Sequence, residues 1–168
     1  MNVSVYAVSI EVFTSALTNL SGLLEKGAAH ATERKFDPAV LVSARLAPDM
    51  LPLSRQIQIA CDLAKSSAAR LAGQEPPRFE DNEKTFEELR ARIAKTLDYL
   101  KSIPARALEG AAERDIRVPA GERTLEFKGL AFVQRWAIPN LFFHVTTAYN
   151  ILRHNGVNLG KRDFLGPM

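Results

Sequence analysis

The sequence has one cysteine, one tryptophan and three histidines among 168 residues. With Cys61 as the single cysteine, no disulfide forms within the chain, which favours a reducing compartment. No P-loop, GxGxxG, GxSxG, HExxH or CxxC pattern occurs, so the enzyme families that these patterns mark are excluded. Cys61 lies in an apolar helical segment with no activating residue nearby, which favours a buried thiol over a nucleophile.

Long runs of one residue kind are also missing. No apolar stretch approaches the ~20 residues that span a bilayer, and Glu11 interrupts the apolar N-terminal segment, which argues against a signal peptide. Lys and Arg number 22 against 19 Asp and Glu, and the longest basic runs are pairs such as Arg34-Lys35. We therefore expect a cytoplasmic protein with neither a membrane nor a nucleic-acid partner.

The apolar spacing predicts four long helices. The first covers residues 2–26 and ends at Gly27, since glycine commonly follows a helix. The second covers residues 52–71, with Arg55, Asp62, Lys65 and Ala69 on its outer side. A capping box at residues 85–88 opens the third, which Pro104 stops. The fourth covers residues 130–154, and Pro139 either kinks it or begins its last part.

Other segments follow different patterns. A short helical turn is expected at residues 37–41, and a β-hairpin from Ile116 to Phe127 with Gly121 in its turn. Residues 157–168 show no clear periodicity. The sequence therefore predicts a single all-α domain over residues 1–168, a four-helix bundle with a small peripheral β-hairpin.

The histidines are the main candidates for chemistry. His144 and His154 are ten residues apart, about 15 Å along a helix, so they cannot share a metal ion. The positions four residues from His144 hold Asn140 and Ala148, which are not usual zinc ligands. The helical position of His144 predicts a neutral ring in the bundle interior, with Tyr6 or an inner-face serine as its hydrogen-bond partner.

A candidate pocket follows from the polar residues on the inner faces of the helices. It consists of His144, Tyr6, Ser9, Ser67 and Tyr149. Such a pocket supports an enzyme only if several polar groups converge in it.

Two aromatic residues are candidates for a contact outside the bundle. Phe143 lies off the main apolar stripe, so it packs against the hairpin, which we favour, or against a partner subunit. Phe143 and Trp136 are the candidate surface for a symmetric homodimer.

Several segments resemble the bacterial family called domain of unknown function 1993. They are His144-Val145-Thr146-Thr147-Ala148-Tyr149-Asn150-Ile151-Leu152-Arg153-His154-Asn155-Gly156-Val157, Gly160-Lys161-Arg162-Asp163-Phe164-Leu165-Gly166, Leu46-Ala47-Pro48-Asp49-Met50, Gln56-Ile57-Gln58, Ala64-Lys65 and Thr85-Phe86-Glu87-Glu88-Leu89. The resemblance implies the DinB/YfiT-like four-helix bundle, a fold that includes proposed metalloenzymes and thiol-dependent transferases and isomerases.

The resemblance also implies where a metal would bind. Metal-binding members use one histidine on the second helix and a pair spaced by four on the last. Here His144 matches the first of the pair, Ala148 occupies the second place, and the second helix has no histidine. We therefore expect an incomplete metal-binding triad and no cofactor, with nickel or zinc disfavoured. The sequence favours a binding or interaction module that forms a homodimer. The alternative is a metal- or thiol-dependent transferase or isomerase-like enzyme with a pocket around His144.

Overall fold

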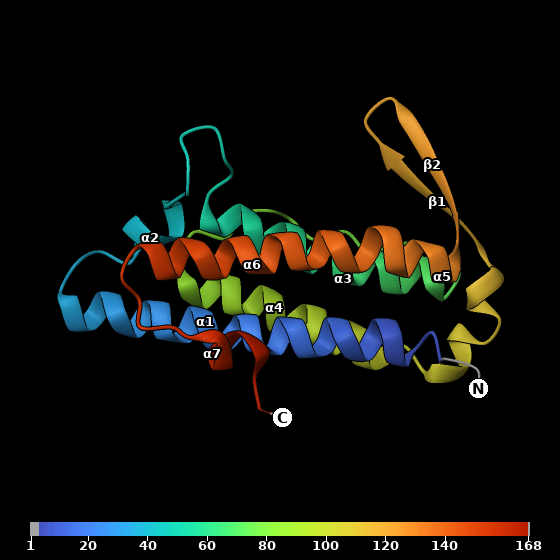
Figure 1. Cartoon of the computed structure of the whole chain (residues 1–168), viewed down its shortest axis with the longest axis horizontal. Coiled ribbons are helices and arrows are strands. Elements are labelled where there is room, and N and C mark those ends of the chain that lie inside the picture. Colours follow the sequence, from blue (N-terminus) through green and yellow to red (C-terminus); the bar gives the residue numbers. More distant parts are fainter. Residues whose placement is uncertain (1–3, 168) are drawn as a thin grey trace.

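The computed structural model describes residues 4–167 and shows four long helices aligned along one axis, with a hairpin at one end (Figure 1). The α-helices are α1 (Val12–Arg34), α2 (Ala39–Ser43), α3 (Leu53–Leu71), α4 (Phe86–Ser102), α5 (Gly129–Phe132), α6 (Ile138–His154) and α7 (Lys161–Leu165). Two π-helical turns, η1 (Ala7–Glu11) and η4 (Val133–Ala137), precede α1 and α6. Two 3₁₀ turns, η2 (Ala105–Leu108) and η3 (Ala111–Glu113), lead to the strands β1 (Asp115–Ala120) and β2 (Arg123–Lys128).

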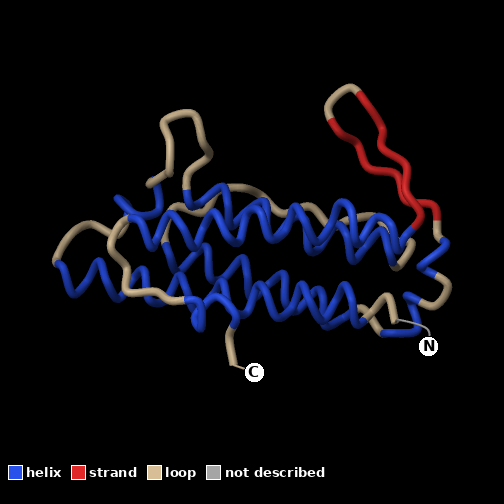
Figure 2. Tube along the Cα trace, viewed as in Figure 1, coloured by secondary structure: helices blue, strands red, loops and turns tan. Residues whose placement is uncertain are grey.

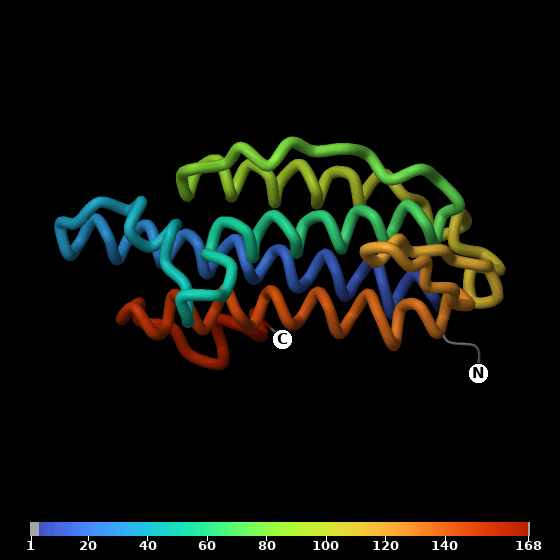
Figure 3. Tube along the Cα trace, turned by 90° about the horizontal axis from the view of Figure 1, so that it is seen from above, coloured from blue at the N-terminus to red at the C-terminus, as the bar shows by residue number. Residues whose placement is uncertain are grey.

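The core lies between α1, α3, α4 and α6. Helix α3 packs against α4 and α6, and α1 packs against the same two helices (Figure 3). Each long helix turns its apolar stripe inward, and the fully buried side chains include Phe13, Leu17, Leu24, Ile57, Ala64, Phe86, Ile93, Leu141 and Ile151. The all-α four-helix bundle with a small hairpin is confirmed.

Helix α1 continues past Gly27, so the predicted stop there is wrong. The last residue of the helix is Arg34, and Lys35, which follows it, has a left-handed backbone with φ of 58°. Gly27 is buried because α1 lies very close to α4 and α6 at this point. A Cβ on Gly27 would lie 3.0 Å from Leu152 Cδ2 and 3.1 Å from Phe86 Cε1. The predicted start at Asn2 lies outside the described residues.

Helices α3 and α4 begin where the sequence predicts. The amide of Glu88 donates to Thr85 Oγ1 at 3.2 Å, and the amide of Thr85 donates to Glu88 Oε2 at 3.1 Å, which confirms the capping box. The predicted outer face of α3 is wrong at two positions, since Lys65 and Ala69 are both buried. Lys65 Nζ lies 4.8 Å from the ring centre of Phe79 in the connection between α3 and α4, a contact that no helical pattern reveals.

The last helical region runs without a break from α5 through η4 into α6. Pro139 lies in the first turn of α6, which confirms one of its two predicted roles. The π-helical turn directly before it leaves room for a residue that lacks an N–H donor. Helix α7, which the sequence pattern does not reveal, packs against α1.

The hairpin pairs Ile116 with Phe127 in antiparallel register, and Gly121 has a positive φ of 61° in its turn. Figure 2 shows both strands extending from one end of the bundle. The ring of Phe127 lies 6.0 Å from that of Phe132 and 6.1 Å from that of Trp136, so these two residues make the aromatic contacts to the hairpin. Phe143 is 60% exposed, and its predicted packing against the hairpin is wrong.

One helix in the described part of the chain, Ala7–Arg34, is long and apolar enough to cross a membrane by length and composition. This corrects the expectation that no segment approaches such a composition. The buried residues of this helix, among them Phe13, Leu17 and Leu20, belong to the bundle core. One helix of this kind is weak evidence for a membrane span, because core helices of soluble proteins can have the same length and composition.

Candidate functional site

The candidate site centres on a contact between α6 and α3. His144 Nδ1 lies 2.7 Å from Oε1 of Gln56, whose side chain is buried. The other end of the amide is fixed, because Gln56 Nε2 donates to the carbonyl of Leu51 at 3.0 Å. Gln56 therefore presents an acceptor to His144, so Nδ1 carries the proton and Nε2 the lone pair of a neutral ring. The predicted partner, Tyr6 or an inner-face serine, is wrong.

The environment of the ring agrees with its expected neutral state. His144 is half-buried, and this burial lowers its pKa below the ordinary value of 6.5, since the charged form loses contact with water. The result is a ring that holds a hydrogen-bond acceptor, Nε2, rather than a positive charge at neutral pH.

The other predicted pocket residues occupy separate places. Ser9 Oγ donates to the carbonyl of Val5 at 2.5 Å, and Ser67 is buried within α3. Tyr6 is half-buried and lines a hollow with residues of η2 and α5. The ring of Tyr149 lies 5.8 Å from that of Phe164 in α7. Within the described residues, none of these four hydroxyl groups hydrogen-bonds to His144.

The residues around His144 do not fit the metal site that the resemblance implies. Gln56 on α3 faces His144, but its amide group already hydrogen-bonds to the carbonyl of Leu51 and to the ring of His144. Ala148 is buried four residues further along α6 and offers only a methyl group. In the part of the chain that the structure describes, no three His, Cys, Asp or Glu residues cluster so that they could hold a metal ion.

Exposed apolar side chains lie beside the His144–Gln56 pair. Phe143 packs edge-on against His144, with 5.2 Å between the ring centroids, and Phe143 is 60% exposed. Leu51, whose carbonyl holds Gln56, is 46% exposed. A polar pair of one buried and one half-buried side chain thus has an exposed apolar residue next to each member. We call Leu51, Gln56, Phe143 and His144 the His144 face.

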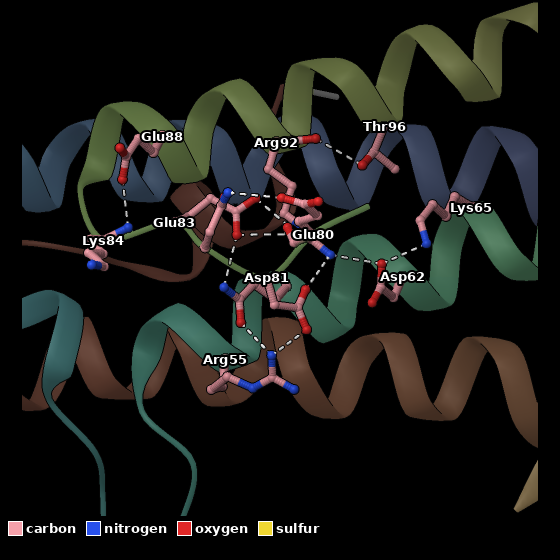
Figure 4. A network of polar contacts seen from close by, with 12 residues as sticks. Arg55, Asp62, Lys65, Glu80, Asp81, Glu83, Lys84, Glu88, Arg92 and Thr96 are labelled. Carbon is pink, nitrogen blue, oxygen red and sulfur yellow. Dashed lines mark hydrogen bonds and ion pairs between the residues drawn. The ribbon is translucent and has the colours of Figure 1, made fainter. Parts of the chain in front are cut away.

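A second polar cluster lies between α3, α4 and the connection that joins them (Figure 4). Arg92 of α4 has a side chain that is only 1% exposed, and it contacts three carboxylates. Its Nη2 lies 2.8 Å from Asp62 and 2.9 Å from Asp81, and its Nη1 lies 2.9 Å from Glu83. Desolvation by burial lowers the pKa of Arg92, but the hydrogen bond to Glu83 and the charges of Asp62 and Glu83 together outweigh it, so the pKa is raised above its ordinary value.

Two further cations complete this cluster. Lys65 Nζ lies 2.7 Å from Asp62, and Arg55 Nη1 lies 2.5 Å from Asp81. The sequence prediction missed the cluster because its members come from two helices and a connection without periodicity. The acidic run that includes Asp81 and Glu83, which begins three residues after Pro77, was the available signal.

Cys61 lies beside this cluster, close to Thr96, Arg92 and Glu83. Burial raises the pKa of the thiol to about 12, and the side chain is fully buried. Its expected role as a buried thiol agrees with this position, since a nucleophilic cysteine needs a lowered pKa and access to substrate.

Comparisons with known proteins agree with this architecture. The model of the family described as domain of unknown function (DUF1993) matches residues 5–165. Among solved structures, a DinB family member protein from Shewanella denitrificans is 45% identical, with a TM-score of 0.91 over 97% of this chain and 92% of that chain. A search of curated proteins gave no match.

Proposed function

The chain belongs to the DUF1993 family, and on that premise we propose that it acts as a binding or interaction module of the DinB-like fold. The observation that carries this proposal is the His144–Gln56 pair, in which a neutral amide already engages one ring nitrogen. A metal-dependent enzyme of this fold needs further donor atoms around that ring, and Ala148 supplies none. The remaining nitrogen of a neutral imidazole accepts a hydrogen bond, which is the chemistry of recognition.

The partner that we propose for the His144 face is a second copy of the chain. Phe143 and Leu51 are large apolar side chains that are 60% and 46% exposed in the single chain. A symmetric dimer covers the same patch on both copies, and exposed aromatic residues are the usual anchors of such interfaces. Trp136 contributes less than the sequence suggests, because the hairpin already covers part of it.

The cellular setting belongs to the same proposal. Cys61 is a free, buried thiol, which suits a reducing compartment. Together with the resemblance to bacterial proteins, this supports a bacterial cytoplasmic protein.

Metal analysis tests the module against the enzyme alternative. Protein purified without a histidine tag is loaded with nickel or zinc, desalted and measured by elemental analysis, beside the variant His144→Gln. We expect far less than one metal ion per chain in both proteins, and melting temperatures that chelator does not change. One ion per chain in the natural protein, lost in His144→Gln, would contradict the proposal and support an enzyme with a pocket around His144.

A further inference from the structure

The connection between α3 and α4 is long and has no helix or strand. It follows Gly73, whose φ is +70°, and ends at the Thr85 cap. Figure 3 shows it returning along the length of the bundle beside α3 and α4. Connections of this length without secondary structure are uncommon in small domains and are often functional.

Side chains rather than backbone attach this connection to the bundle. In the described chain, no backbone–backbone hydrogen bond joins residues 75–83 to a helix. Instead, Arg92 Nη1 donates to the carbonyl of Glu80 at 2.7 Å and to Glu83 Oε1 at 2.9 Å. Gln58 Nε2 on α3 donates to Glu83 Oε2 at 2.9 Å. The attachment is therefore mostly polar and concentrated near Arg92.

Little apolar burial supports the attachment. No residue from 72 to 85 is buried, and Phe79, the one aromatic residue of the segment, is half-buried. Its ring lies 4.1 Å from Lys95 Nζ and 4.8 Å from Lys65 Nζ, so charged groups rather than core side chains surround it. Segments with few buried apolar contacts are those that open locally while the rest of a protein stays folded.

The bundle keeps a partner for Arg92 when the segment is absent. Asp62 belongs to α3 and contacts both Arg92 and Lys65, so these two buried cations retain one carboxylate. Asp81 and Glu83 leave with the segment. Opening therefore exposes a positively charged groove without leaving Arg92 fully unpaired, and a buried cation without any partner would be costly.

We propose that residues 74–84 form a releasable cover over the groove between α3 and α4. The cover opens as a unit while the four long helices stay packed, and Arg92 is its latch through Asp81 and Glu83. Cys61 is the residue before Asp62, whose carboxylate contacts Arg92, and it is fully buried when the cover is closed. The proposal includes the exposure of Cys61 on opening.

The single cysteine makes this opening measurable. In the closed state the pKa of Cys61 is about 12, so the thiol is both shielded and protonated at neutral pH. A neutral reagent, N-ethylmaleimide, is added to the natural protein over a range of low urea concentrations, and labelling is followed by mass spectrometry. Local opening predicts a labelling rate that changes little with urea, since little surface is exposed.

Variants test whether the contacts of Arg92 with Asp81 and Glu83 control the opening. Glu83→Gln should speed labelling about tenfold or more, as expected for loss of one charge-assisted hydrogen bond. Asp81→Asn, at a more exposed position, should speed it less, and Glu122→Gln in the hairpin turn is the matched control without effect. High sodium chloride should also speed labelling of the natural protein, because it screens partly exposed ion pairs.

The proposal is overturned if labelling of the natural protein rises as steeply with urea as global unfolding does. It is also overturned if Glu122→Gln speeds labelling as much as Glu83→Gln. If Glu83→Gln does not fold, Asp81→Asn and the salt dependence decide, and no acceleration in either of them rejects the cover.

Discussion

Two glycines of α1 offer a matched test of how closely the helices pack. Gly22 and Gly27 both lie inside the helix, and replacing either with alanine removes backbone freedom from the unfolded chain. Alanine is favoured over glycine in a helix by about 1 kcal/mol. A Cβ at Gly22 meets no atom within 4 Å, whereas one at Gly27 meets Leu152 at 3.0 Å and Phe86 at 3.1 Å.

The expected magnitudes follow from these distances. Gly22→Ala should raise the free energy of unfolding by roughly 0.5–1 kcal/mol. Gly27→Ala gains the same propensity but must displace core side chains, and overpacking of this kind costs about 1–3 kcal/mol. Gly27→Ala should therefore be less stable than Gly22→Ala by roughly that overpacking cost.

Urea unfolding followed by far-ultraviolet circular dichroism measures both free energies. For a domain of this size, each kcal/mol corresponds to a change of about 2–4 °C in melting temperature. If Gly27→Ala is stabilised as much as Gly22→Ala, the close approach of α1 to α4 and α6 is refuted.

Three further predictions concern single side chains. His144→Ala should lower the free energy of unfolding by on the order of 1–3 kcal/mol, because it leaves Oε1 of the buried Gln56 without its partner. His144→Gln should lower it less, and a urea titration that ranks the two variants in the opposite order contradicts the pairing. Thr85→Ala should lower stability by about 1 kcal/mol through loss of the helix cap, and an unchanged urea midpoint would argue against the cap. For Asp81 and Glu83, burial raises the pKa, but hydrogen bonds and charge interactions outweigh it, with Arg92 common to both residues, and hold both pKa values below their ordinary 3.8 and 4.5. The two carboxylates therefore contribute fully to stability above those ordinary pKa values, and this contribution is lost as the pH falls through the pKa of the folded state. An Asp81→Asn variant should lose less stability on acid titration than the natural protein. An equal loss in both proteins would contradict the stabilising role of the Asp81 carboxylate.

The fold was largely predictable because its signals are local. Apolar spacing defines the long helices, Thr85 and Glu88 define a cap, and alternating residues define the hairpin. The predicted helix end at Gly27 is wrong because glycine occurs both after helix ends and where two helices pack closely. Only the packing of α1 against α4 and α6 distinguishes these two roles. Lys65 was placed outside because the segment that covers it has no periodic pattern.

The candidate site was less predictable because its contacts are distant in sequence. The inward position of His144 follows from helical spacing, but its partner Gln56 is 88 residues away and glutamine carries no motif of its own. The Arg92 cluster combines charged residues from two helices and a loop, so no single stretch of sequence predicts it.

Sedimentation velocity tests the central claim, a binding module that pairs with a second copy through the His144 face. The natural protein is compared with Phe143→Ser and with Leu165→Ser, a control of the same chemistry at a 45% exposed position on α7. We predict a dimer at high micromolar concentration for the natural protein and Leu165→Ser, and a shift to monomer for Phe143→Ser. A monomeric natural protein, or a Phe143→Ser variant as dimeric as the natural one, would contradict the account.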